Sequence, residues 1–104
     1  AARADGHLAA SEAARAALAA AGAAFLHPIA KATQVKHILG AAAHTARAFE
    51  LAATNDPTIG TNHIVLSRTF ANPIVIEILN RYPRAPLAGG RIGELIRQLD
   101  TSLR

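Results

Sequence analysis

The sequence contains no cysteine, methionine or tryptophan, and only three phenylalanines and one tyrosine among 104 residues. Without cysteine the chain can form no disulfide, use no thiolate nucleophile and hold no cysteine-ligated zinc. Nothing points to an oxidising compartment, so we expect a cytoplasmic protein. The few aromatic side chains argue against a stacking platform for single-stranded nucleic acid. The missing methionine suggests a processed chain or a piece of a longer protein.

Long apolar runs are also missing. The longest weakly apolar stretch, residues 16–26, is mostly alanine and is closed by Arg15 and His27. It is shorter than the roughly 20 residues that a membrane span requires. Asp5 and Glu12 occupy the region where a secretory signal would carry positive charge. We therefore expect neither a membrane span nor a secretory signal.

The formal net charge is +4, and it is spread evenly along the chain. Residues 1–52 hold five basic and three acidic side chains, and residues 53–104 hold six and four, so each half has an excess of two. Arginine outnumbers lysine nine to two and alanine is abundant, a composition that we associate with GC-rich bacterial genomes. Net positive charge permits attraction to phosphate, but no basic arm concentrates it.

Nucleic-acid binding therefore stays an alternative function rather than the main prediction. Four arginines in the last quarter of the chain could form a basic patch after folding: Arg81, Arg84, Arg91 and Arg97. Against this alternative, the sequence has no dense helix of polar and basic residues that could read a DNA groove. The competing interpretation is a scattered, solvated basic surface.

The hydrophobic pattern predicts a single all-α domain over residues 1–104, a compact bundle of about five helices with short connections. The clearest helix runs from Thr33, a candidate cap, to Ala53. Its apolar residues recur at three- and four-residue steps: Val35, Ile38, Leu39, Ala42, Ala46, Phe49 and Ala53. This periodicity is typical of a core helix.

The alanine-rich N-terminal part predicts one further helix. Ser11 is the expected cap, residues 13–24 form the helix, and residues 1–8 are expected to be an irregular lead-in. The helix should end at His27-Pro28, because the residue before proline is driven away from helical geometry. Since the buried side chains are small, loose docking of this helix is an open alternative.

The stretch Ile59–Leu66 organises the centre of the prediction. Gly60 is expected to make a tight chain reversal, and Thr61 to cap a helix that runs to about Phe70. Three apolar residues follow as expected buried anchors: Ile64, Val65 and Leu66. The alternative is that every residue of this stretch serves packing alone.

Two more helices complete the predicted bundle. Asn72 and Pro73 are typical of a helix start, and residues 74–79 are apolar nearly all round, although their β-branched side chains leave a strand as an alternative. Residues 80–90 predict a loop rich in proline and glycine. The final helix should bury Ile92, Leu95, Ile96, Leu99 and Leu103. Its charged residues, Arg91, Glu94, Arg97 and Asp100, should form a solvated face with a Glu94–Arg97 pair.

No constellation predicts catalysis. His37 and His44 lie seven residues apart, or ~10.5 Å along a helix, which is too far for one metal ion. His63 and Ser67 have the spacing of helix neighbours but no nearby acid that would orient the histidine. Residues 89–93 resemble a phosphate loop only in glycine content. We therefore expect no enzyme activity, no metal and no cofactor.

The stretch Ile59-Gly60-Thr61-Asn62-His63-Ile64-Val65-Leu66 resembles the Ile-Gly-Thr-Glu-His-Leu-Leu-Leu signature of the Clp N-terminal repeat, a helical module in front of Clp AAA+ unfoldases. The helix order over residues 33–100 agrees with that family. The resemblance implies a non-enzymatic module that binds protein substrates or adaptors, either for a Clp-type ATPase or as a free-standing relative. No Walker lysine motif is present, so any ATP hydrolysis would belong to a partner or to another part of the protein.

The chain departs from the family in two ways. The family usually has two repeats, whereas residues 33–104 form one repeat and residues 1–32 a divergent N-terminal helix. A single repeat would expose the face that its twin covers, which predicts a homodimer. At Asn62 the family has glutamate, which in some members helps to bind phosphorylated arginine, so the resemblance leaves that recognition open here.

The sequence offers two groups of candidate partner-binding residues. One lies at the start of the central helix and the other in the loop after the short helix: Thr61, Asn62 and His63, and Arg81, Tyr82 and Arg84. The alternative is that Thr61 and His63 only hold the turn and that the loop residues face solvent.

Overall fold

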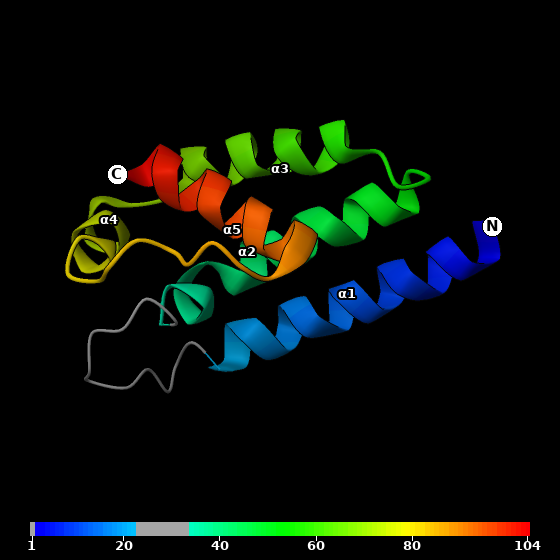
Figure 1. Ribbon diagram of the computed structural model, residues 1–104, viewed down its shortest axis with the longest axis horizontal. Helices are drawn as coiled ribbons and strands as arrows, with labels where there is room; N and C mark the ends of the chain where they lie inside the picture. Colours follow the sequence, from blue (N-terminus) through cyan, green and yellow to red (C-terminus); the bar gives the residue numbers. More distant parts are fainter. Residues whose placement is uncertain (1, 23–33) are drawn as a thin grey trace.

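The computed structural model describes residues 2–22 and 34–104, and these residues form five α-helices and no strand (Figure 1). The helices are α1 (Ala2–Gly22), α2 (Gln34–Ala52), α3 (Pro57–Phe70), α4 (Pro73–Leu79) and α5 (Gly90–Leu103). The predicted all-α bundle is therefore confirmed. α2 lies in the middle, with α1 along one side and α3 and α5 on the other (Figure 1). None of the described helices is long and apolar enough to cross a membrane.

The core lies between α2, α3 and α5, and the end of α4 closes it. Its buried side chains come mainly from the three- and four-residue steps of α2 and α5: Val35, Leu39, Ala43, Ala46, Ile64, Leu79, Ala85, Leu95, Ile96, Leu99 and Leu103. Phe49 does not belong to this core, because 52% of its surface is exposed. Its ring instead lies against the ring of His63, with the centroids 5.1 Å apart.

α1 starts earlier than predicted. It begins at Ala2, so Ser11 is an exposed residue in the middle of the helix and not its cap. The physical reason is the high helix propensity of alanine, which extends the helix without a capping side chain. Ala16 is buried against α2, and Glu12 Oε2 lies 2.6 Å from His44 Nδ1. The predicted stop at His27-Pro28 and the predicted cap at Thr33 lie outside the described residues.

α3 also starts earlier than predicted, at Pro57. Asp56 is its N-cap, because its Oδ1 accepts a hydrogen bond of 2.9 Å from Thr58 N. Asp-Pro is the stronger start signal, since it combines a capping carboxylate with a proline at the first helical position. The chain reversal before the helix is made by Thr54 and Asn55, whose φ angles are 56° and 59°. Thr61 is therefore not a cap.

Gly60 lies inside α3 and makes no turn. A Cβ at this position would lie 1.8 Å from Glu50 Oε2 and 2.3 Å from Glu50 Cδ. Glu50 is fully buried in α2. Glycine is therefore required here because the backbone of α3 packs directly on a buried carboxylate.

Glu50 joins three helices. Arg91, in the first turn of α5, places Nε 3.2 and 3.1 Å from the two carboxylate oxygens of Glu50, and its Nη2 also binds Oε2. Arg91 further donates to the carbonyl of Pro57, and Arg47 donates to Glu50 Oε1 over 2.9 Å. The hydrogen bond to Glu50 raises the pKa of Arg91 above its ordinary value, against the lowering effect of burial. This set of contacts is called the Glu50 clamp below.

α4 begins as predicted. Asn72 Oδ1 accepts a hydrogen bond of 3.0 Å from Val75 N, and Pro73 occupies the first helical position. The strand alternative for residues 74–79 is therefore wrong. The helix is less buried than expected, since Leu79 is fully buried but 64% of the surface of Ile74 is exposed.

The charged residues of α5 are not all solvated. Asp100 is only 1% exposed; it accepts a hydrogen bond of 2.9 Å from Ala85 N and pairs with Arg104 over 2.6 Å. The predicted Glu94–Arg97 pair is replaced by a pair between Arg91 and Glu94, 3.1 Å apart. Both of these ion pairs follow helical spacing, whereas the burial of Asp100 depends on its contact with Ala85, 15 residues away in the sequence.

Candidate functional site

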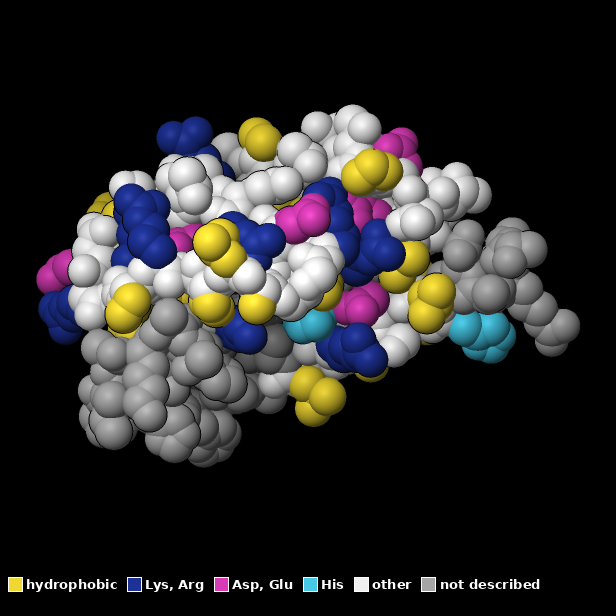
Figure 2. Space-filling model, in the orientation of Figure 1, with side chains coloured by type: hydrophobic (Ala, Val, Ile, Leu, Met, Phe, Trp, Pro, Cys, Tyr) yellow, Lys and Arg dark blue, Asp and Glu magenta, His cyan; other side chains and the backbone are white. Residues whose placement is uncertain are grey.

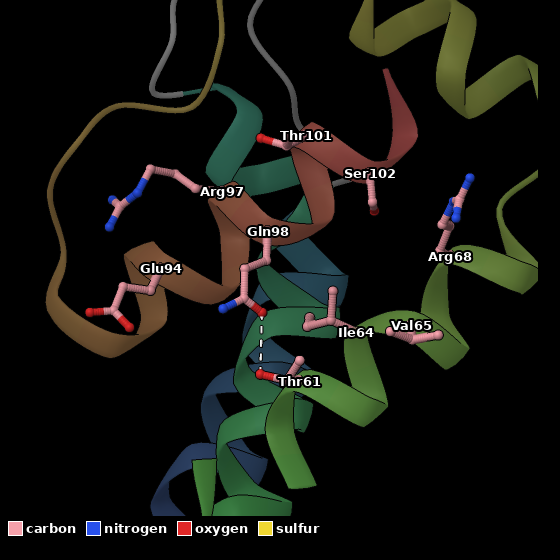
Figure 3. Close-up of a pocket in the computed structure, with 9 residues that line it drawn as sticks. All are labelled: Thr61, Ile64, Val65, Arg68, Glu94, Arg97, Gln98, Thr101 and Ser102. Atoms are coloured by element: carbon pink, nitrogen blue, oxygen red, sulfur yellow. Dashed lines mark hydrogen bonds between the residues drawn. The ribbon is translucent and has the colours of Figure 1, made fainter. Parts of the chain in front are cut away.

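The main hollow of the described structure is a groove of about 650 Å³ between α3 and α5 (Figure 3). α3 supplies one wall with four residues: Thr61, Ile64, Val65 and Arg68. α5 supplies the other wall with five: Glu94, Arg97, Gln98, Thr101 and Ser102. Both sets recur at three- and four-residue steps, which places each set on one face of its helix.

The middle of the groove is apolar. Ile64 is buried at its base, while Val65 stands on the rim with 60% of its surface exposed. Thr61 on α3 and Gln98 on α5 face each other across the groove, with Thr61 Oγ1 and Gln98 Oε1 3.5 Å apart (Figure 3). Since 3.5 Å is at the long limit for a hydrogen bond, this contact is weak and an incoming polar group can replace it.

The charged residues of the groove have different surroundings. Arg97 is turned toward the loop before α5, where it donates to the carbonyls of Pro86 and Ala88 over 3.0 and 2.9 Å (Figure 3). Glu94 is paired with Arg91. Arg68 is exposed, and it takes part in none of the ion pairs formed among the described residues. Its guanidinium is therefore available to a ligand.

The first group of predicted site residues is split by the helix. Thr61 lines the groove, Asn62 is exposed outside it, and His63 is partly buried against Phe49. Consecutive residues of an α-helix point about 100° apart, so three neighbours cannot share one face. Of this group, only Thr61 belongs to the groove.

The second group lies elsewhere. Arg81 is exposed and pairs with Glu77 over 3.1 Å, and Arg84 is exposed. Tyr82 is partly buried on the core, and its carbonyl accepts a hydrogen bond from Arg104. None of the three lines the groove.

The structure does not bring the two groups together. Thr61 contacts α5 at Gln98, whereas Tyr82 contacts Arg104, the residue that directly follows α5. Six residues of α-helix separate these contact points, which is about 9 Å along the axis. The predicted residues therefore lie at two separate places, of which one contributes a single residue to the groove.

Comparisons with protein-family models, with curated proteins and with solved structures found no match. The site is therefore interpreted from its own geometry.

The described histidines and the glycine-rich segment considered in the sequence analysis do not form a recognisable site. Among the residues that the structure describes, no group of three or more histidine, aspartate or glutamate side chains is placed to hold a metal ion. His44 is paired with Glu12. Gly89, in the segment that resembles a phosphate loop, has φ 90° and precedes the first turn of α5, so its role there is to let the chain enter the helix.

The four arginines of the predicted basic patch are mostly engaged within the molecule. Arg81 pairs with Glu77, and Arg91 pairs with Glu50 and Glu94. Arg97 donates to two backbone carbonyls. Figure 2 shows the same arrangement on one face, where basic side chains lie beside acidic ones. The ion pairs of Arg81 and Arg91 reduce the positive potential that a nucleic-acid surface needs.

A second, smaller hollow of about 380 Å³ lies between α1 and α2. Its lining contains no charged residue: Ala9, Ala10, Ala13, Ala16, Thr45, Ala48, Phe49 and Ala52. It offers few groups that could orient a ligand, so the groove between α3 and α5 is the better candidate.

Proposed function

We propose that this chain is a non-enzymatic protein-binding module that holds a segment of a substrate or adaptor protein in the groove between α3 and α5. The observation that carries the proposal is the groove itself, whose apolar base lies between a few polar and charged side chains. Such surfaces suit peptide segments, because apolar contacts supply affinity and a few polar groups fix orientation. The volume of about 650 Å³ accommodates several side chains.

The resemblance to the Clp N-terminal repeat supports a more specific proposal, in which the partner system is a Clp-type ATPase. The residues that carry the resemblance, 59–66, lie on α3, and three of them line the groove: Thr61, Ile64 and Val65. The resemblance itself rests on this motif and on the order of the helices. Under this proposal the chain delivers or selects proteins, and ATP hydrolysis belongs to the partner ring.

Size-exclusion chromatography with light scattering, run with and without a Clp-type ATPase ring, tests this proposal. We expect the chain to co-elute with the ring and Val65→Asp to abolish co-elution, because the change would replace an apolar side chain of the groove with a charge. Leu66→Asp is the matched control, since Leu66 is a similarly exposed neighbour on α3 that does not line the groove. Equal losses for both variants, or no co-elution of the wild-type chain, would contradict the proposal.

The homodimer implied by a single repeat is part of the same proposal. Large apolar side chains are exposed at the end of α3 and the start of α4, with Phe70 at 79% and Ile74 at 64%. Burying such residues is the usual reason for a two-fold interface. Light scattering of the chain alone over a range of concentrations checks this point, and a monomer at every concentration would rule the dimer out.

A basic regulator that binds nucleic acid is the alternative function. The ion pairs of Arg81 and Arg91 within the molecule do not favour it. Phosphate binding would weaken steeply between low and moderate salt, whereas binding through apolar anchors would change little. The salt dependence of whatever ligand is found therefore separates the two functions.

A further inference from the structure

The carboxylates that the structure describes are engaged within the molecule. Every carboxylate whose side chain the structure describes has an intramolecular partner: Glu12 with Arg15 and His44, Glu50 with Arg47 and Arg91, Asp56 with the α3 N-terminus, Glu77 with Arg81, Glu94 with Arg91, and Asp100 with Arg104. All of these carboxylates except Asp56, whose partner is a backbone N–H, form ion pairs, so the charge left for a partner on the described surface is mainly basic.

The groove between α3 and α5 also carries an excess of positive charge. Arg68 stands exposed on the α3 wall without an ion pair. On the α5 wall the charge of Arg97 is met only by carbonyl dipoles, and Glu94 is already neutralised by Arg91. The groove thus combines an apolar base with a positive rim, and complementarity across an interface favours a partner of the opposite charge.

We propose that the groove selects an acidic, apolar segment of its partner protein, with an apolar side chain on Ile64 and Val65 and a carboxylate at Arg68. The proposal deepens the function proposed above and rests on it, since it assumes that the groove binds protein. A nucleic acid fits these features less well, because its phosphates would follow a row of cations and Arg68 is the single exposed arginine that lines the groove.

The spacing of the groove residues sets the spacing of the preferred segment. Arg68 lies three residues after Val65 and four after Ile64, so its Cα is about 4.5–6 Å further along the axis of α3. A helical segment that carries leucine and glutamate three or four residues apart presents the same separation. The preferred segment therefore has the pattern Leu-x-x-Glu or Leu-x-x-x-Glu on one face.

Fluorescence anisotropy with three labelled synthetic peptides tests the proposal. The first is helical and repeats leucine and glutamate four residues apart, the second has lysine in place of glutamate, and the third has serine in place of leucine. We expect the first peptide to bind and the other two to bind at least about tenfold more weakly, because each loses one of the two complementary features. Raising the salt concentration should weaken the first peptide only modestly.

Arg68→Gln and Arg84→Gln are the matched variants. Both remove an exposed arginine, but only Arg68 lines the groove, and far-UV circular dichroism confirms that each variant folds. Arg68→Gln should weaken the glutamate peptide about two- to fivefold, as expected for an exposed ion pair, and should not weaken the lysine peptide, because it removes a like charge. Arg84→Gln should change neither.

The outcomes separate this proposal from the function on which it rests. If the glutamate and lysine peptides bind equally well, the preference for an acidic segment is overturned. If Val65→Asp also abolishes the binding of both peptides, the groove still binds protein segments. Equal effects of Arg68→Gln and Arg84→Gln would show only a general charge effect and would also overturn it. If no peptide binds, this inference fails, and co-elution of Val65→Asp with the ATPase ring then decides the proposed function independently.

Discussion

Replacing Gly60 with alanine should destabilise the protein, although the same change usually stabilises a helix. In an exposed helix interior alanine is favoured over glycine by about 1 kcal/mol. Here the added Cβ would lie 1.8 Å from Oε2, 2.3 Å from Cδ and 2.6 Å from Cγ of Glu50. These atoms belong to a fully buried side chain, so either Glu50 or the backbone of α3 must move.

The Glu50 clamp sets the size of the effect. Glu50 can leave the clash only by giving up its contacts with Arg91 and Arg47, which hold both carboxylate oxygens. Separating the partners of a buried ion pair costs about 3–5 kcal/mol, and the propensity gain offsets about 1 kcal/mol. The net loss in the free energy of unfolding for Gly60→Ala is therefore about 2–4 kcal/mol.

Urea denaturation followed by circular dichroism measures this loss. The matched background is Glu50→Ala, which removes the atoms that the new Cβ would meet. In that background Gly60→Ala should leave the stability unchanged or raise it by up to about 1 kcal/mol. Asn62→Ala, an exposed change in the same helix, should stay within about 0.5 kcal/mol of the wild type. If Gly60→Ala costs the same with and without Glu50, the clash is not the cause and the reasoning fails.

Two further changes test other supports of the fold by the same denaturation assay. Asn72→Ala should cost about 1 kcal/mol, because it leaves Val75 N without its cap; an unchanged stability would show that the cap contributes nothing. Asp100→Ala should cost about 3–5 kcal/mol, because it leaves the largely buried Arg104 guanidinium without its carboxylate and Ala85 N without an acceptor. A loss below about 1 kcal/mol would show that the carbonyls around Arg104 suffice.

The helices that the sequence predicts well are those whose signals are local. The helix α2 and the Asn72-Pro73 start of α4 depend on residues within a few positions of each other, and both are confirmed, although Phe49 on α2 is exposed and not part of the core. Gly60 was misassigned because glycine serves two purposes, positive φ and close approach, that look the same in a sequence. Only the position of Glu50 in the fold shows which of the two applies.

The partners of the buried charges also could not be predicted from the sequence. Glu50 and Arg91 are 41 residues apart, and Asp100 meets Ala85 from 15 residues away. Helical periodicity reports only which residues share a face, so it assigned Asp100 to solvent. A charge on the apolar side of a helix is a signal for such a partner, but the partner itself is determined by tertiary packing.

The candidate groove, like the buried charges, depends on tertiary packing that the sequence does not show. Each wall follows a local pattern that is readable in the sequence, for instance Thr61, Ile64, Val65 and Arg68 on α3. What makes a groove is the spacing between the two helices, which no local pattern contains. The sequence therefore indicates the right helix through Thr61, but it groups this residue with neighbours on other faces. It does not identify Arg68, and of the α5 wall it offers only Arg97, as part of the alternative basic patch.

The Glu50 clamp links the stability of the fold to the geometry of the groove. Gly60 directly precedes Thr61 on one wall, and Arg91 lies one turn before Glu94 on the other, so both walls are anchored to the same buried carboxylate. A substitution that moves Glu50 must therefore change the distance between the walls as well as the free energy of unfolding. Loss of the α4 cap changes neither contact. Gly60→Ala should accordingly weaken partner binding even under conditions where it remains folded, whereas Asn72→Ala at equal residual stability should not.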